Sequence, residues 1–331
     1  MDATAFTSAD ISGVISVRCG ETTLLEHAYG LADIANGRDN RVDTRFGTAS
    51  LGKILTAVTI LRLVEQGEVG LDTTLGELLL HDLGTIDPGV TVQQLLCHTS
   101  GVPDYFDESV MDDYAELWQT VPNYTIRCSE DLLPLFRDKP MMYTSGERFQ
   151  YNNSGYVLLG LLLEAIADEP FDAVVADQVL APCGMNATGW YELDRLPGNC
   201  ANSYILDEHT GGYYTNIYSI DAKGSGAGGA FTTAGDMHRF WMALTCGRLL
   251  GPELLEQMLQ VHASDPGEQS WYGLGVWLFD GDSGHPFVQG SDPGVECISS
   301  CRRRDNTVIT VLSNRGDDVW RIYEAIWKSL G

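Results

Sequence analysis

Strand-like segments at both ends of the chain, with helix-like segments between them, most constrain the fold. Residues 11–19 and 22–29 are predicted to form a hairpin around Gly20-Glu21. Apolar or alternating runs bounded by turn residues predict antiparallel strands near the C-terminus, at 272–279, 285–289, 295–300 and 307–313. One sheet built from both ends of the chain, with a helical region inserted between them, accommodates this order. The sequence therefore predicts an α+β fold with its site in the cleft.

The pattern changes near residues 68 and 206, which suggests two structural units within 331 residues. Segments 1–67 and 206–331 would form a discontinuous α/β domain, and residues 68–205 a helical domain. Apolar periodicity within the inserted part predicts helices at 129–137, 153–168 and 170–181.

Ser50-x-x-Lys53 opens an apolar-periodic segment that runs to Gly67, a residue that favours a helix end. In a helix, the serine and the lysine lie on one face, so Lys53 can contact the Ser50 hydroxyl. A desolvated lysine loses pKa and can accept the serine proton. A serine that caps a helix, followed by an unrelated surface lysine, would produce the same sequence pattern. However, Lys53 is the only one of four lysines with a serine three residues before it, and its flanks are apolar.

Tyr151-x-Asn153 immediately precedes a predicted helix, which would hold both side chains in place. A phenol can relay protons if a nearby ammonium lowers its pKa, and an amide can hydrogen-bond a substrate. Tyr214-Thr215-Asn216 matches the same pattern but lies in a Gly/Tyr-rich segment with no such anchor. We therefore prefer Tyr151, although packing at a helix start would also account for it.

Composition excludes several classes of function. A formal net charge of −26 argues against binding to nucleic acids or anionic membranes, which require basic patches. The eight cysteines and seven histidines show no metal-binding spacing, so we expect free thiols and no metal. Residues 1–5 lack the basic start of a signal peptide, which predicts a cytoplasmic protein, or an exported one if the natural chain starts earlier.

Three motifs occur in a characteristic order: Ser50-x-x-Lys53, then Leu95-Leu96-Cys97-His98-Thr99-Ser100-Gly101, then Gly146-x-x-Phe149-x-Tyr151-Asn152-Asn153. Together they resemble the serine beta-lactamase-related family, which holds class C beta-lactamases, DD-peptidases, D-aminopeptidases and esterases. The likeness covers nearly the whole chain and implies the α/β domain plus helical domain of that family. It also implies that Ser50 is the acylated nucleophile, Lys53 its base, Tyr151 a second proton carrier and Asn153 a contact to the substrate amide.

The third motif of that family, Lys/His-x-Gly on an edge strand, would fall within residues 287–295, and here it departs from the pattern. The position of the cation is occupied by Val288, whereas Gly290 is kept. The resemblance implies an oxyanion hole formed by the backbone N–H groups of Ser50 and Ser291. The missing cation argues against substrates that carry a carboxylate, such as penicillins.

These observations predict a serine hydrolase that forms a Ser50 acyl-enzyme without metal or cofactor. Its substrate would be a small ester or amide or a short peptide, with esterase activity favoured over beta-lactamase activity. A DD-peptidase or D-aminopeptidase, or a catalytically silent ligand-binding member, are the alternatives. The aromatic segment 104–127 is a candidate pocket wall, although a packed surface loop would have the same composition. Oligomeric state, and whether Lys53 or Tyr151 is the acylation base, stay open at this stage.

Overall fold

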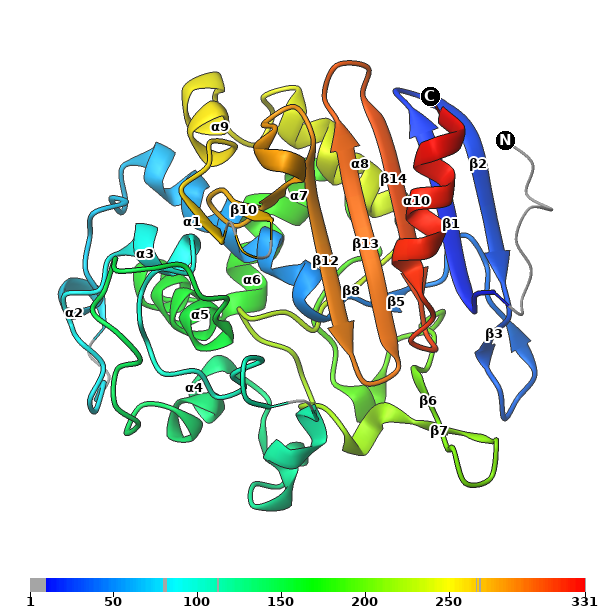
Figure 1. Ribbon diagram of the computed structural model, residues 1–331, viewed down its shortest axis with the longest axis horizontal. Coiled ribbons are helices and arrows are strands. Elements are labelled where there is room, and N and C mark those ends of the chain that lie inside the picture. The colour runs from blue at the N-terminus through cyan, green and yellow to red at the C-terminus, as the bar shows by residue number, and fades with distance from the viewer. Residues whose placement is uncertain (1–9, 80–81, 112, 266, 268, 331) are drawn as a thin grey trace.

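A large antiparallel sheet joins the two ends of the chain, as Figure 1 shows for the computed structural model. The structure describes residues 10–79, 82–111, 113–265, 267 and 269–330, so the N-terminal segment used for the signal-peptide prediction lies outside it. The strand order is β2 (Thr22–Tyr29), β1 (Gly13–Cys19), β14 (Thr307–Ser313), β13 (Val295–Arg302), β12 (Pro286–Asp292), β11 (Trp277–Leu278), β10 (Ser270–Tyr272) and β9 (Ala263–Asp265). The predicted α+β class, with a sheet from both termini, is confirmed.

Helices cover both faces of this sheet. Alternate residues of the central strands enter two different apolar clusters, because successive side chains of a strand point to opposite faces. Val14 and Leu312 pack on the side of α8 (Ala234–Thr245), whereas Ile15 and Val311 pack on the side of α10 (Val319–Leu330). Figure 1 shows α10 in front of the sheet beside β14, with α8 behind β13 and β14.

Helices supply most of the regular structure of the inserted region, although loops make up much of it, and its helices pack beside α1 (Lys53–Gln66) at one end of the sheet. Its helical segments are α2 (Leu75–Leu78), α3 (Val92–Leu96), α4 (Ser129–Leu132), α5 (Asn153–Ala167), α6 (Phe171–Val175) and α7 (Ala181–Cys183), with a π-helical turn at Ala176–Leu180 between the last two. The remaining elements are α9 (Pro252–Met258) and the short strands β3 (Leu31–Asp33), β4 (Arg38–Asp39), β5 (Phe46–Gly47), β6 (Tyr204–Leu206), β7 (Tyr213–Thr215) and β8 (Phe231–Thr232). Gly67 ends α1 in the left-handed conformation, at the residue where the sequence predicts a stop.

Two local predictions were wrong. The segment 272–279 is not one strand, because β10 and β11 form a tight antiparallel pair around Gly275, whose φ is 84°. Ser50 lies in a short 3-10 turn, Ala49–Gly52, and α1 begins only at Lys53. The φ of Ala49 is 45°, a left-handed value that a non-glycine residue adopts at a cost of about 1 kcal/mol or more, so the helix cannot extend back through it.

Candidate active site

The turn that carries Ser50 is held between two close backbone contacts. On one side lies the glycine-rich segment 224–229, where Gly228 has a φ of 140° and a Cβ would lie 2.3 Å from the Ala49 carbonyl oxygen. On the other side lies β12, where a Cβ on Gly290 would lie 2.2 Å from the Thr48 carbonyl oxygen. Side chains at either position would displace this turn, so these two glycines allow the strand and the loop to clamp it.

Lys53 is a buried lysine whose amine contacts three oxygen atoms. The residue is only 2% exposed. Its Nζ lies 2.8 Å from Ser50 Oγ, 2.8 Å from Asn153 Oδ1 and 2.6 Å from the Ala227 carbonyl oxygen. The Asn153 and Ala227 oxygens can only accept hydrogen bonds. A neutral amine has two N–H groups for those two acceptors and one lone pair left for the Ser50 hydroxyl. The geometry therefore suits a lysine that accepts the serine proton.

The electrostatic environment brings the Lys53 pKa close to the range in which a base can work. Burial is the largest influence and lowers the pKa to about 8, while the carboxylates of Glu108, Asp104, Asp292 and Asp221 oppose that shift. At pH 7 about a tenth of the amine is then neutral, compared with less than about a thousandth for a lysine of ordinary pKa. Lys53 thus combines contact with Ser50 and a pKa suited to proton transfer.

Tyr151 lies beside this pair and is held by aromatic contacts. Its ring lies 4.4 Å from the His98 ring and stacks on Trp277 at 5.9 Å between centroids, and the Lys53 amine lies 5.1 Å from its centre. Burial raises the pKa of Tyr151 well above its usual value, and a hydrogen bond to Ser50 only partly offsets this. The expectation that a nearby ammonium would lower this pKa was wrong, because burial raises it and the neighbouring Tyr272, Glu108 and Asp104 add to the rise. The phenol stays protonated and can donate a proton rather than take one.

Asn153 is the first residue of α5 and reaches the site from its N-terminus. The Asp104 carboxylate accepts hydrogen bonds from the backbone N–H groups of Asn153 at 2.8 Å and Ser154 at 3.1 Å. The preceding residue, Asn152, caps the helix by accepting a hydrogen bond from the Gly155 N–H at 2.7 Å. These contacts fix the start of the helix and aim the Asn153 amide at Lys53.

The histidine motif supports Tyr151 rather than Ser50. His98 has a φ of 58°, and its Nδ1 accepts a hydrogen bond from the Asn152 N–H at 3.1 Å. Burial lowers the pKa of His98 well below its usual value, so the ring is neutral. The side chain thereby ties its own tight turn to the segment that carries Tyr151, which agrees with a structural role.

The third-motif strand lies against the Ser50 turn but brings no cation to it. The Val288 side chain is 4% exposed and belongs to the apolar cluster that also contains α1. Gly290 faces the Ser50 turn, and the Ser291 side chain is exposed and donates a hydrogen bond to Glu296. The Ser291 side chain therefore points away from the Ser50 turn, because neighbouring residues of a strand face opposite sides.

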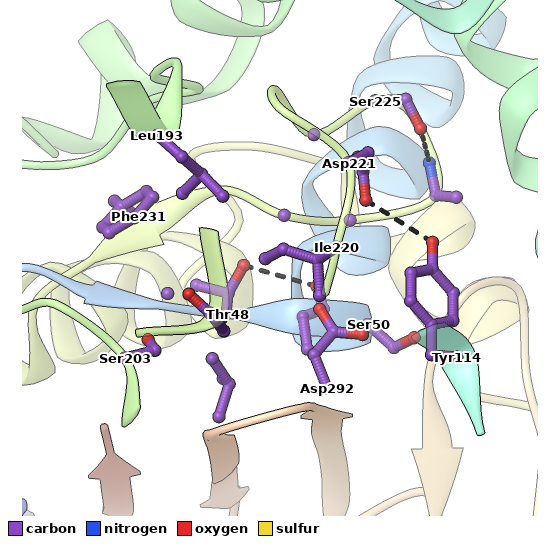
Figure 2. A pocket seen from close by; sticks show the side chains of 18 of the residues that line it. Thr48, Ser50, Tyr114, Leu193, Ser203, Ile220, Asp221, Ser225, Phe231 and Asp292 are labelled. Atoms are coloured by element: carbon purple, nitrogen blue, oxygen red, sulfur yellow. Dashed lines mark hydrogen bonds between the residues drawn. The ribbon is translucent and has the colours of Figure 1, made fainter. Parts of the chain in front are cut away.

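A pocket with about 640 Å³ of empty space, partly open to solvent, opens at Ser50 (Figure 2). Tyr105 and Tyr114 of the aromatic segment line it, together with Asn153 and with carboxylates from Asp221 and Asp292. Tyr124 of the same segment is 64% exposed and does not line this pocket. The rival Tyr214 lies on β7 with 51% exposure, while the nearby Asn216 does line the pocket.

Sequence reasoning missed the carboxylates around the site: Asp104, Glu108, Asp221 and Asp292. Asp292 lies within the third-motif stretch, and its place in that stretch was the only available signal. Asp221 precedes the glycine-rich segment, but no pattern links it to Ser50. Their approach depends on tertiary structure.

Other expectations concern metals, thiols and membranes. Among the described residues, no group of three or more His, Cys, Asp or Glu side chains could hold a metal ion. All eight cysteines are described and are free thiols. In the described part of the chain, no helix has the length and apolar character needed to cross a membrane.

Known proteins resemble this chain over most of its length. A penicillin-binding protein from Bacillus halodurans has a solved structure that superposes with a TM-score of 0.91 at 38% identity, covering 97% of each chain. Penicillin-binding protein 4* of Bacillus subtilis (strain 168) is 26% identical over 93% of this chain and 69% of its own length. Esterase EstB of Burkholderia gladioli is 33% identical over 53% of this chain and 46% of its own length.

The family comparison agrees with the fold and with the order of the motifs. The family model described as Beta-lactamase matches residues 4–325, which is almost the whole sequence. The chain belongs to the beta-lactamase family.

Proposed function

We propose that this protein is a serine hydrolase that cleaves esters or amides through a Ser50 acyl-enzyme, with esterase or amidase activity favoured over beta-lactamase activity. The observation that carries the proposal is the buried Lys53 amine, 2.8 Å from Ser50 Oγ, with a pKa of about 8. The names of the relatives, penicillin-binding protein and esterase, support a hydrolase but do not separate these activities.

In the proposed first step, neutral Lys53 takes the Ser50 proton as the oxygen attacks the substrate carbonyl carbon. The resulting oxyanion would accept hydrogen bonds from the backbone N–H groups of Ser50 and Ser291. Tyr151, protonated and hydrogen-bonded to Ser50, would pass a proton to the leaving group, while Lys53 would replace that proton. Water then attacks the acyl-enzyme ester, with the same two residues carrying protons, and releases the acid and free Ser50.

Val288 supports the preference against beta-lactams. A buried valine offers no charge to a substrate carboxylate, and the residues that share its face of β12, Gly290 and the acidic Asp292, supply no positive charge either. We therefore expect penicillins to acylate Ser50 slowly or not at all.

Intact-mass spectrometry tests this proposal. The wild type and Ser50→Ala would be incubated separately with a fluorophosphonate and with a penicillin. A mass gain with the fluorophosphonate that is lost in Ser50→Ala supports an activated nucleophile, and the absence of a gain with penicillin supports the substrate preference. If the fluorophosphonate adds no mass to the wild type, Ser50 is not activated and a ligand-binding function replaces the hydrolase proposal.

A further inference from the structure

The Ser50 pocket is unusual in the sign of its charge. Its described lining includes the carboxylates of Asp221 and Asp292 and the hydroxyl groups of Tyr105 and Tyr114, but no arginine, lysine or histidine. Lys53 lies behind Ser50, and its amine already contacts three oxygen atoms of the protein. A substrate in this pocket therefore meets acidic groups and no free cation among the described residues.

Asp292 occupies the strand face on which the family motif would carry its cation. Side chains two residues apart share a face of a strand, so Val288, Gly290 and Asp292 of β12 point the same way. Gly290 faces the backbone of the Ser50 turn, which shows that this is the face turned toward the site. Where the family motif has a cation, this chain therefore has the apolar Val288. A carboxylate, that of Asp292, follows four residues later on the same strand face.

The Asp292 carboxylate is also without a partner. Within the part of the chain that the structure describes, no group donates a hydrogen bond to it and no basic side chain forms an ion pair with it. The residue is only partly exposed, and burial together with the nearby Asp221 charge raises the pKa of this carboxyl to about 8, although the Lys53 charge opposes the shift. A carboxylate in this position is costly for the empty pocket, and a bound cation would relieve that cost.

Asp221 approaches the same pocket from the segment before the glycine-rich loop. Tyr114 Oη donates a long hydrogen bond of 3.4 Å to its Oδ1, and burial raises its pKa to about 6. Figure 2 shows Asp221 facing Tyr114, with Asp292 and Ser50 around the same cavity. The two carboxylates therefore come from distant segments and meet next to the nucleophile, as a subsite for one charged group would require.

We infer that Asp221 and Asp292 bind a protonated amine of the substrate, so that the preferred acyl donors are aminoacyl esters or amides whose ammonium lies close to the scissile carbonyl. This inference rests on the proposed Ser50 hydrolase and specifies its substrate class. The chain has 46 acidic and 20 basic residues, so the whole molecule carries a negative electrostatic field, as the pocket does. This field attracts cations and repels carboxylates. Asp221 and Asp292 are then specificity-determining residues.

Two anilides of equal shape test the inference. Alanine p-nitroanilide and isobutyric acid p-nitroanilide differ only in an ammonium replacing a methyl group, and succinic acid p-nitroanilide adds an anionic comparison. The kcat/KM ratio of the alanyl to the isobutyryl substrate would be measured at pH 7 in the wild type, Asp292→Asn and Asp221→Asn. Asp39→Asn, which removes an exposed carboxylate of β4, is the matched control.

The wild type is expected to prefer the alanyl substrate, and each pocket variant to lose about tenfold or more of that ratio, because a hydrogen bond to a charged group is removed. Asp39→Asn should keep the wild-type ratio. A wild type that prefers the isobutyryl or succinyl substrate would overturn the inference, as would an Asp292→Asn ratio within threefold of wild type. If Asp292→Asn is not recovered folded, Asp221→Asn decides by the same criterion.

Fluorophosphonate labelling of each variant separates the two proposals. Labelled Ser50 with no ammonium preference refutes the subsite and leaves the hydrolase intact. A wild type whose Ser50 is not labelled removes the hydrolase itself.

Discussion

At the scale of single residues, the two groups that we propose as proton carriers have opposite pKa shifts. Burial lowers the pKa of Lys53 to about 8 and raises that of Tyr151 well above its usual value. The same loss of solvent favours the neutral form of both groups, a free amine in one case and an intact phenol in the other. The structure therefore favours Lys53 as the acylation base and Tyr151 as the proton donor, a choice that the motifs leave open.

The base assignment predicts the pH dependence of the reaction. Below pH 8 Lys53 is increasingly protonated, so kcat/KM for the uncharged isobutyric acid p-nitroanilide should rise with pH and level off above about 8. Because the Asp292 carboxylate raises the Lys53 pKa, Asp292→Asn should move the midpoint of this curve to lower pH. Rates of Ser50→Ala supply the background. A profile that is flat from pH 6 to 9 would contradict this assignment.

Removing the Tyr151 hydroxyl should slow catalysis while the base remains in place. In Tyr151→Phe we expect kcat to fall about 100-fold or more, the usual size of a lost acid–base contribution, with the pH midpoint still set by Lys53. Tyr214→Phe, at the rival Tyr-x-Asn on exposed β7, is the control and should behave as wild type. Equal losses in both variants, or a loss in Tyr214→Phe alone, would show that the wrong tyrosine was chosen.

At the scale of elements, contact between β12 and the Ser50 turn determines where Ser50 lies. Both segments were expected from sequence, the first as a strand and the second as a helix start. Their pairing depends on Gly290, because a Cβ there would lie 2.7 Å from the Leu51 amide nitrogen as well as 2.2 Å from the Thr48 carbonyl oxygen. The position of Ser50 thus depends on a close backbone approach between distant segments.

This contact predicts that Gly290→Ala will impair activity more than an ordinary glycine substitution. The methyl group must push β12 away from the Ser50 turn, and a displacement of about 1 Å can cost about 100-fold in rate. Gly198→Ala is the control, since a Cβ at Gly198 has no atom within 4 Å. kcat/KM and thermal unfolding would be measured for both. Wild-type activity in Gly290→Ala would show that the turn tolerates this shift.

At the scale of the whole molecule, the net charge of −26 makes like-charge repulsion a general influence on the folded state. Added salt screens this repulsion. We expect the Tm at pH 7 to rise by about 2 °C or more between 20 and 500 mM NaCl, with choline chloride giving a similar rise. Calorimetry in both salts checks this, and a Tm that falls in both would contradict it.

Local patterns in the sequence determined much of this protein. The strands, the helices and the end of α1 at Gly67 could be predicted from sequence, because each depends on residues that are neighbours along the chain. The ordered motifs identified Ser50, Lys53, Tyr151 and Asn153 as candidate site residues. The hairpin hidden in 272–279 and the left-handed Ala49 escaped, because contacts from other segments override local propensity there.

Only the tertiary structure decided the electrostatics of the site. Burial, which depends on everything packed around a side chain, set the pKa directions of Lys53 and Tyr151. Asp221 and Asp292 are far from Ser50 along the chain and carry no shared pattern, yet folding brings them to one pocket. Sequence periodicity reports which face of an element is apolar, but the charge inside a cavity depends on which elements meet there, and that is a property of the folded chain alone.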